Sequence, residues 1–157
     1  LDDWLAALAP AARQALLQAT RARLEWPEPR VALGQALAGV AHAAIDVSDG
    51  LLQDLGHIAA ASGCGMVLQA GSLPLAPALQ ALPPACAWQA ALGGGDAYEL
   101  CFTAPASRRH DVMRAGQRAG VPLARIGAVV AQPGIRVVRP DGAALQALPA
   151  GFDHFGQ

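Results

Sequence analysis

The segment 44–52, AIDVSDGLL, restricts the fold of this chain more than any other stretch. An apolar run ends at the carboxylate of Asp46, and Ser48 and Asp49 then precede a second apolar run. Serine is a preferred N-cap of helices, and an acid in the first turn complements the helix dipole. We therefore predict a strand over residues 42–47 that leads into a helix capped by Ser48, with Asp49 in its first turn.

Apolar periodicity places the other elements. Helices and strands are mixed without strict βαβ alternation, which predicts an α+β domain with helices packed on a mixed β-sheet. We expect all 157 residues to form a single domain that opens with a helical lead-in over residues 1–28. The other predicted elements are helices over 30–40, 84–92 and 105–120, a proline-rich loop over 73–77, and strands over 66–68, 98–103, 124–130 and 135–139.

The composition excludes several classes of protein. Only 15% of the residues are charged and the net charge is −1, against about 25% charged residues in a typical domain. A nucleic-acid partner bound through a basic face is therefore not expected. All eleven basic residues are arginine, and without lysine the chain cannot form a phosphate-binding loop of the Walker type. We expect no membrane partner, since no run of about 18 apolar residues could span a bilayer.

The cysteines indicate the compartment. Cys64, Cys86 and Cys101 are odd in number and lack a CxxC spacing, a pattern typical of reduced, mostly buried thiols. No secretory signal peptide is recognisable. We therefore expect a cytoplasmic protein. The chain begins with leucine rather than methionine, so we also expect it to be a piece of a longer protein.

The acids of the segment 44–52 support two interpretations. Mg²⁺ prefers carboxylate oxygens and is often held by one or two of them together with substrate phosphates. Asp46 and Asp49 could converge on such a cation while Ser48 and the helix N-terminus address a phosphate. The alternative is an ordinary capped helix, in which the cap contributes about 1 kcal/mol. That alternative explains Ser48 and Asp49 but leaves Asp46 without a role.

Two further stretches are each open to two interpretations. Three consecutive glycines precede Asp96, and they either let the backbone approach a ligand or form a turn that needs positive φ. Near the C-terminus, Phe152 and Phe155 either stack on a planar ring or anchor the terminus to the core. Neither stretch decides between its alternatives alone.

Taken together, these stretches resemble the C-terminal half of the thiamine-monophosphate kinase family, over about residues 29–157. The implied fold is the C-terminal domain of the aminoimidazole ribonucleotide synthetase-like fold, which selenophosphate synthetase also shares. The runs that match in order and spacing are AIDVSDGL at 44–51, DLGHI at 54–58, GGD at 94–96, YELCFT at 98–103, RIG at 125–127 and GFDHF at 151–155.

The resemblance implies an enzyme that transfers the γ-phosphoryl group of ATP to thiamine monophosphate, giving thiamine diphosphate, with Mg²⁺ as its metal. It further implies that Asp46 and Asp49 are Mg²⁺ ligands, that Ser48 contacts ATP, and that Asp96 and Phe152 contact the thiamine substrate. Such catalysis consists of positioning and charge neutralisation. We therefore expect no catalytic residue and no covalent intermediate in this chain.

The resemblance also implies partners. The family's N-terminal half carries most of the metal-binding aspartates, much of the nucleotide site and the dimer contacts, so we expect an inactive fragment here and a homodimer in the full-length protein. The family's second acid after the glycines is replaced by Ala97. Two alternatives remain: another ATP-using enzyme of the same superfamily, of the selenophosphate or aminoimidazole ribonucleotide synthetase type, and a non-catalytic α+β module whose acids are helix caps.

Overall fold

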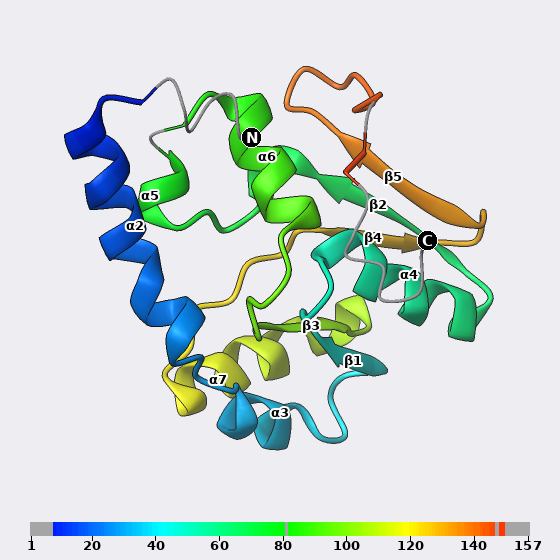
Figure 1. The fold of residues 1–157 in the computed structure, drawn as a ribbon. Helices are drawn as coiled ribbons and strands as arrows, with labels where there is room; N and C mark the ends of the chain where they lie inside the picture. The colour runs from blue at the N-terminus through cyan, green and yellow to red at the C-terminus, as the bar shows by residue number, and fades with distance from the viewer. Residues whose placement is uncertain (1–7, 81, 147, 150–157) are drawn as a thin grey trace, which may run out of the picture.

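The computed structural model describes residues 8–80, 82–146 and 148–149, and within them helices pack against two small β-sheets (Figure 1). This architecture confirms the α+β prediction. The helices are α2 (Pro10–Glu25), α3 (Val31–Leu37), α4 (Leu51–Ser62), α5 (Pro77–Gln80), α6 (Pro84–Gly93) and α7 (Arg109–Ala119), with short 3₁₀ turns η1 (Ala70–Ser72) and η2 (Ala106–Arg108). The strands are β1 (Ala43–Asp46), β2 (Gly65–Gln69), β3 (Leu100–Thr103), β4 (Gly127–Val130) and β5 (Gly134–Val138).

The described strands form two separate sheets. In the first sheet β1 and β3 are antiparallel, with Ala43 opposite Thr103 and Asp46 opposite Leu100. In the second sheet β2 lies in the middle, antiparallel to β4 and parallel to β5. Parallel neighbours need a long connection, and residues 70–133 lie between β2 and β5.

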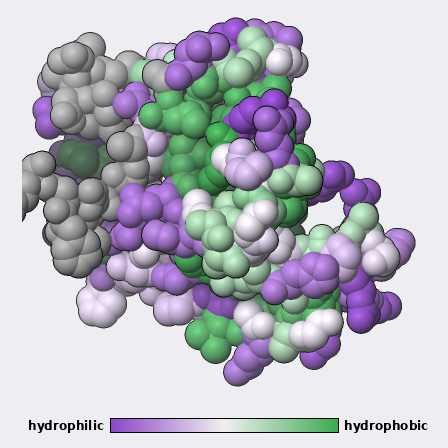
Figure 2. Space-filling view, turned by 90° about the vertical axis from the view of Figure 1, so that its right-hand side faces the viewer, coloured by the Kyte–Doolittle hydropathy of each residue, from purple (hydrophilic) through white to green (hydrophobic). Residues whose placement is uncertain are grey.

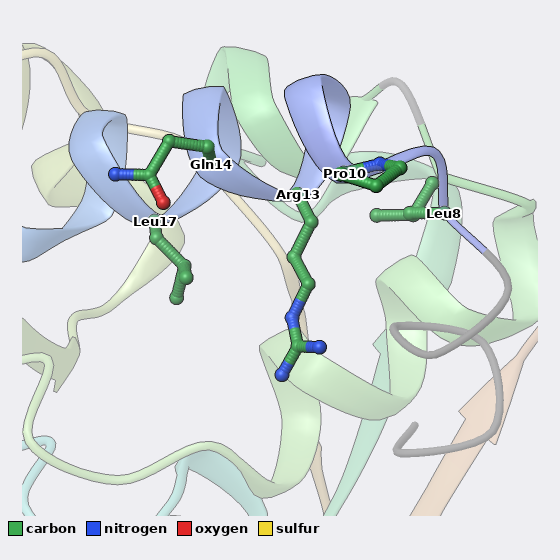
Figure 3. Close-up of a pocket in the computed structure, with 5 residues that line it drawn as sticks. All are labelled: Leu8, Pro10, Arg13, Gln14 and Leu17. Atoms are coloured by element: carbon green, nitrogen blue, oxygen red, sulfur yellow. The ribbon is translucent and has the colours of Figure 1, made fainter.

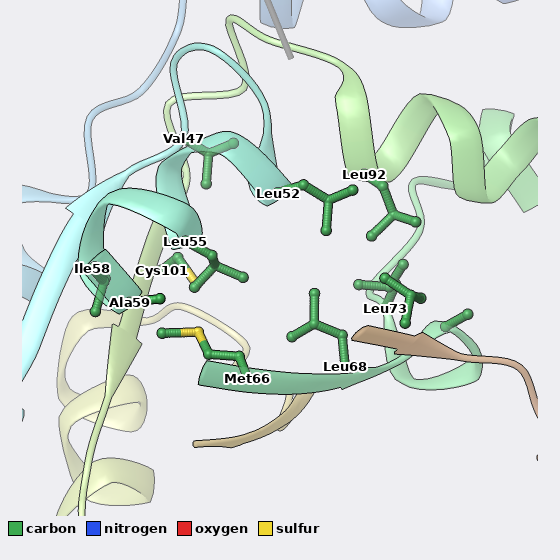
Figure 4. Close-up of a cluster of buried hydrophobic side chains, with 12 residues drawn as sticks. Val47, Leu52, Leu55, Ile58, Ala59, Met66, Leu68, Leu73, Leu92 and Cys101 are labelled. Carbon is green, nitrogen blue, oxygen red and sulfur yellow. The ribbon is translucent and has the colours of Figure 1, made fainter. Parts of the chain in front are cut away.

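Alternate side chains of β3 face two hydrophobic cores. Cys101 is buried in the larger core, whereas Leu100 and Phe102 pack on the smaller core with α3 and α7. Successive side chains of a strand point to opposite faces, so one short strand serves both cores. The buried residues of the larger core, most of which Figure 4 labels, are Val47, Leu52, Leu55, Ile58, Ala59, Met66, Leu68, Ala70, Leu73, Leu92, Cys101 and Val137.

Helix α2 contributes to neither core. It begins at Pro10, because proline at the first helical position lacks only an N–H group that would have no helical partner. None of its residues is buried, and Leu24 is 63% exposed. On another side of the molecule, a strip of hydrophobic residues bordered by polar ones reaches the surface (Figure 2). No helix in the described ranges is long and apolar enough to cross a membrane.

Several element boundaries differ from the predictions: α3 ends at Leu37, α7 begins at Arg109 and β4 begins at Gly127. Three further differences are informative. Strand β3 begins at Leu100 rather than at Tyr98, and α4 begins at Leu51. Tyr98 has a φ of 49° and Gly50 a φ of 127°, and neither a strand nor a right-handed helix contains such values. The third difference is Pro77, which opens α5 instead of closing a loop.

Candidate functional site

Two loops beyond the ends of β1 and β3 hold four of the five predicted site residues. We call residues 46–50 the acidic loop and residues 93–98 the glycine loop. The antiparallel pairing of β1 and β3 continues into these loops, because the N–H groups of Asp96 and Tyr98 donate to carbonyls of the acidic loop, that of Asp96 to Ser48 at 2.8 Å. The pairing therefore brings Asp96 beside the acidic loop. The fifth residue, Phe152, lies outside the described residues.

Glycines allow the two loops to come this close. A Cβ on Gly95 would lie 2.5 Å from the carbonyl oxygen of Ser48, and a Cβ on Gly50 would lie 3.0 Å from the carbonyl oxygen of Gly93. Gly50 also has a φ of 127°, which side chains with a Cβ rarely adopt. The glycine run is therefore a packing requirement between two backbones.

A buried aspartate, and not Ser48, organises the start of α4. Asp54 is 2% exposed, and its Oδ2 accepts hydrogen bonds from the N–H groups of Ser48, Asp49 and Gly50 at 3.0, 3.2 and 3.3 Å. The N-cap is Gly50, which has no side chain that could cap the helix. The predicted cap at Ser48 and the predicted place of Asp49 in the first turn are wrong. Asp54 reaches back to accept from the N–H groups of residues 48–50, and the helix begins only at Leu51.

The pleat of β1 turns Asp46 to the surface. Asp46 is exposed at the end of the strand, whereas its neighbours Ile45 and Val47 belong to the larger core. The side chain of Asp46 helps to line a small hollow of about 200 Å³, together with Pro29, Arg30, Tyr98, Glu99 and Leu100. A ligand can thus reach the carboxylate without any opening of the core.

A larger hollow of about 440 Å³ lies elsewhere, along α2. Its lining comes from α2 and the residues just before it, and Arg13 and Leu17 point to the same side of the helix (Figure 3). The described residues that line it include no carboxylate, thiol or imidazole. We therefore place the chemistry at the smaller hollow beside Asp46, despite its size.

The backbone is strained where the glycine loop ends. Asp96 and Tyr98 have φ values of 55° and 49°, in the left-handed region that costs residues other than glycine about 1–3 kcal/mol each. The hydroxyl of Tyr98 donates to Oδ1 of Asp96 at 3.1 Å. This bond and the charge of Asp96, with smaller contributions from burial and from Asp46 and Asp49, raise the pKa of Tyr98. Three carboxylates thus act on one hydroxyl, so the loops form a negatively charged surface.

An ion-pair network anchors the glycine loop to the segment before α3. Nε and Nη2 of Arg30 donate to the two carboxylate oxygens of Glu99 at 2.9 and 2.8 Å, and Arg23 of α2 donates to the same carboxylate at 2.7 Å. A bidentate pair of this kind fixes orientation as well as charge. The hydrogen bonds to Arg30 lower the pKa of Glu99, and the same pair raises the pKa of Arg30. Since Glu99 directly follows Tyr98, the network holds the end of the loop.

The network predicts a difference in acid stability between this chain and Glu99→Gln. A carboxylate whose pKa is lowered on folding stabilises the fold above its unfolded pKa, and this contribution disappears as the pH falls through the folded pKa. The Glu99 side chain is 45% exposed, so we expect at most about 1 kcal/mol at neutral pH. Urea unfolding between about pH 5 and about pH 3 should show a steeper loss for the wild type than for the variant. Parallel pH profiles would contradict this role of Glu99.

Comparisons with known proteins establish the class of this domain. The chain belongs to the family described as AIR synthase related protein, C-terminal domain, whose family model matches residues 6–139. It is similar to thiamine-monophosphate kinase from Stenotrophomonas maltophilia K279a, whose crystal structure matches with a TM-score of 0.73 at 45% identity, over 88% of this chain and 42% of that one. The predicted fold family is thus confirmed.

The more specific resemblance is also confirmed. The thiamine-monophosphate kinase of Escherichia coli K12 is 44% identical over 131 residues, which cover 82% of this chain and 40% of the kinase. A structure described as AaThiL complexed with AMPPCP and TMP matches with a TM-score of 0.68 at 28% identity, over 95% of this chain and 44% of that one. The chain therefore spans about 40% of the length of these curated relatives.

Some residues that shape the site had no assigned role in the sequence analysis. Asp54 lies in the matching run DLGHI. Because it follows Gly50 by four residues, about one helical turn, this spacing could have indicated that its side chain reaches back to the start of α4. The pairing of Arg30 with Glu99 joins residues 69 apart in the chain, and nothing in the sequence alone indicates it. Both interactions act on the backbone of the two loops rather than on a ligand.

Proposed function

We propose that this chain forms part of an ATP-dependent kinase that phosphorylates thiamine monophosphate to thiamine diphosphate. One observation carries the proposal: the extended β1–β3 pairing gathers Asp46, Ser48, Asp49 and Asp96 at the junction of two loops, in a chain 44% identical to the matching part of a thiamine-monophosphate kinase. The chain supplies the C-terminal part of the site for Mg²⁺, ATP and substrate.

The donor set fits Mg²⁺. Asp46 and Asp49 offer the hard carboxylate oxygens that this ion prefers. Within the described part of the chain, no group of three or more acids, histidines or cysteines could hold a metal. One or two carboxylates completed by substrate phosphates are a usual way to bind Mg²⁺, so we assign Asp46 and Asp49 as ligands. When bound, the ion would neutralise charge on the transferred phosphoryl group.

The residues of this chain bind ATP and the thiamine substrate and orient them. The hydroxyl of Ser48, which takes no part in capping α4, contacts ATP. Asp96 contacts the thiamine substrate, its position fixed by the bond from Tyr98 and by the backbone bond to Ser48. We assign Phe152 to the same substrate. Holding reactants in a reactive geometry supplies much of the rate enhancement in such reactions, and the tightly packed loops suit that task.

The proposal includes partners and a compartment. The relatives extend well beyond the matched region, and we propose that an N-terminal domain completes the nucleotide site. We further propose a homodimer for the full-length protein and a cytoplasmic location. The three cysteines are free, and burial raises the pKa of Cys101 to about 11, which suits reduced, unreactive thiols.

The test uses a whole kinase in which this chain follows the part of the Stenotrophomonas maltophilia protein that precedes the matched region. We expect this chimera to convert ATP and thiamine monophosphate to thiamine diphosphate when Mg²⁺ is present, as measured by chromatography. The chain alone should show no turnover, and addition of the separately made N-terminal part should restore some. A folded chimera that forms no thiamine diphosphate, beside an active Stenotrophomonas enzyme, would refute the proposal.

The same assay separates the alternatives. An enzyme of the selenophosphate or aminoimidazole ribonucleotide synthetase type would consume ATP with the substrate of that reaction and not with thiamine monophosphate. A non-catalytic module would consume ATP with none of them. The module loses one of its arguments, the cap at Ser48, because the N-cap of α4 is Gly50.

A further inference from the structure

Asp54 is the one charged side chain that is buried among the described residues, with 2% of its surface exposed. It sits in the first turn of α4, directly beneath the acidic loop. Its neighbours Leu52 and Leu55 belong to the larger core (Figure 4). A charge at such a place costs free energy unless hydrogen bonds compensate it, so its partners indicate why it is there.

The partners of Asp54 are backbone N–H groups. Oδ2 accepts from Ser48, Asp49 and Gly50 at 3.0, 3.2 and 3.3 Å, and no ion pair of Asp54 occurs in the ranges that the structure describes. Successive N–H groups that converge on one point form an anion-binding nest, the arrangement that phosphate-binding loops use. Here the anion is a side chain of the protein itself.

The outward side of the acidic loop presents carboxylates instead of N–H donors. Asp46 is exposed and Asp49 half-buried, while Asp96 lies exposed on the adjoining glycine loop. A free phosphate that approached this surface would meet carboxylates and no available amide of residues 48–50. A divalent cation would meet oxygen ligands.

We propose that Asp54 is a positioning residue that closes the N–H groups of residues 48–50 to external anions, so that phosphate-bearing ligands bind the acidic loop only together with a divalent cation. This inference rests on the proposed function, because it concerns how the same site receives the phosphates of its ligands. Asp54 does not touch the ligand and acts through the loop that carries Asp46 and Asp49.

The first measurement is amide hydrogen exchange on this chain and on Asp54→Asn. We expect the amides of residues 48–50 to exchange about tenfold or more faster in the variant, because an asparagine cannot compensate three donors as a carboxylate does. The exchange rates of the Ile58 and Ala59 amides in α4 serve as the reference for a change in the overall stability of the fold. Val137→Ala, which removes buried methyl groups from β5, is the control for a general loss of stability and should not single out residues 48–50.

The second measurement is a titration with inorganic pyrophosphate, followed by NMR at the amides of residues 48–50. In the wild type we expect a response with Mg²⁺ and none in the presence of a chelator. In Asp54→Asn the Mg²⁺-dependent response should weaken, and a response without metal should emerge as the N–H groups become available. A merely structural role would leave the requirement for metal unchanged.

Three results would overturn the inference: unchanged exchange at residues 48–50 in the variant, a wild-type response to pyrophosphate without metal, or no wild-type response with metal. The two pyrophosphate titrations of the wild type can refute the inference even if Asp54→Asn does not fold. None of these measurements uses thiamine monophosphate, so the inference and the proposed substrate can fail separately.

Discussion

Asp46→Asn, introduced into the whole kinase, is expected to lower turnover by about 100-fold or more, since even the outer partners of metal ligands are typically worth 10–100-fold. Asparagine has nearly the same shape, but its neutral amide is a poor ligand for a hard cation. The stability should not fall, because Asp46 is exposed and stands among other acids. Removal of one of several like charges costs the fold nothing and can slightly stabilise it.

The measurements are initial rates over a range of Mg²⁺ concentrations and the midpoint of thermal unfolding. Asp141→Asn is the matched control, because Asp141 is an exposed aspartate beyond β5, paired with Arg139 and distant in sequence from both loops. This control should keep its turnover. Unchanged turnover in Asp46→Asn would refute a metal role, and a large loss of stability would show that the carboxylate serves the fold.

Gly95→Ala is expected to part the two loops. The new Cβ would lie 2.5 Å from the carbonyl oxygen of Ser48, which is backbone and cannot rotate away. Overpacking of this kind costs about 1–3 kcal/mol. The same shift would displace Asp96 from the acidic loop, and a misplacement of about 1 Å can reduce a rate about 100-fold. Urea unfolding of this chain and initial rates of the whole kinase measure the two effects.

Gly56→Ala provides a control of opposite sign. Gly56 lies inside α4, and a Cβ there would meet no atom within 4 Å apart from its chain neighbours and the nearby backbone of its own helix. Alanine should therefore stabilise the helix by about 0.5–1 kcal/mol and leave the rate unchanged. Equal effects of the two substitutions on stability would contradict the proposed contact between the loops.

The sequence was sufficient for the elements that depend on local pattern. The helix predicted over residues 84–92 is α6 (Pro84–Gly93), and the strand predicted over residues 135–139 is β5 (Gly134–Val138). The order of helices and strands led to the α+β class. The resemblance to thiamine-monophosphate kinases came from several runs in one order, which is more specific than any single motif.

The sequence was insufficient where distant residues decide the backbone. Ser48 had every local property of an N-cap, but the buried Asp54 accepts from the N–H groups of residues 48–50 and the helix begins only at Leu51. Tyr98 fitted a strand by composition, yet it has a positive φ, with Glu99 fixed next to it by Arg30. Local propensity is a weak prior when a buried charge or an ion pair acts on the same backbone.

The pleat of β1 has a consequence for how this domain can change in evolution. Asp46, the last residue of β1, faces solvent and the next residue, Val47, faces the core, because successive residues of an extended backbone point to opposite sides. A single-residue insertion or deletion within β1 would exchange them, burying a carboxylate and exposing a valine. Changes of two residues would preserve the alternation. Among functional homologues, insertions and deletions in this strand should therefore involve an even number of residues, because only these keep the carboxylate exposed and the valine buried.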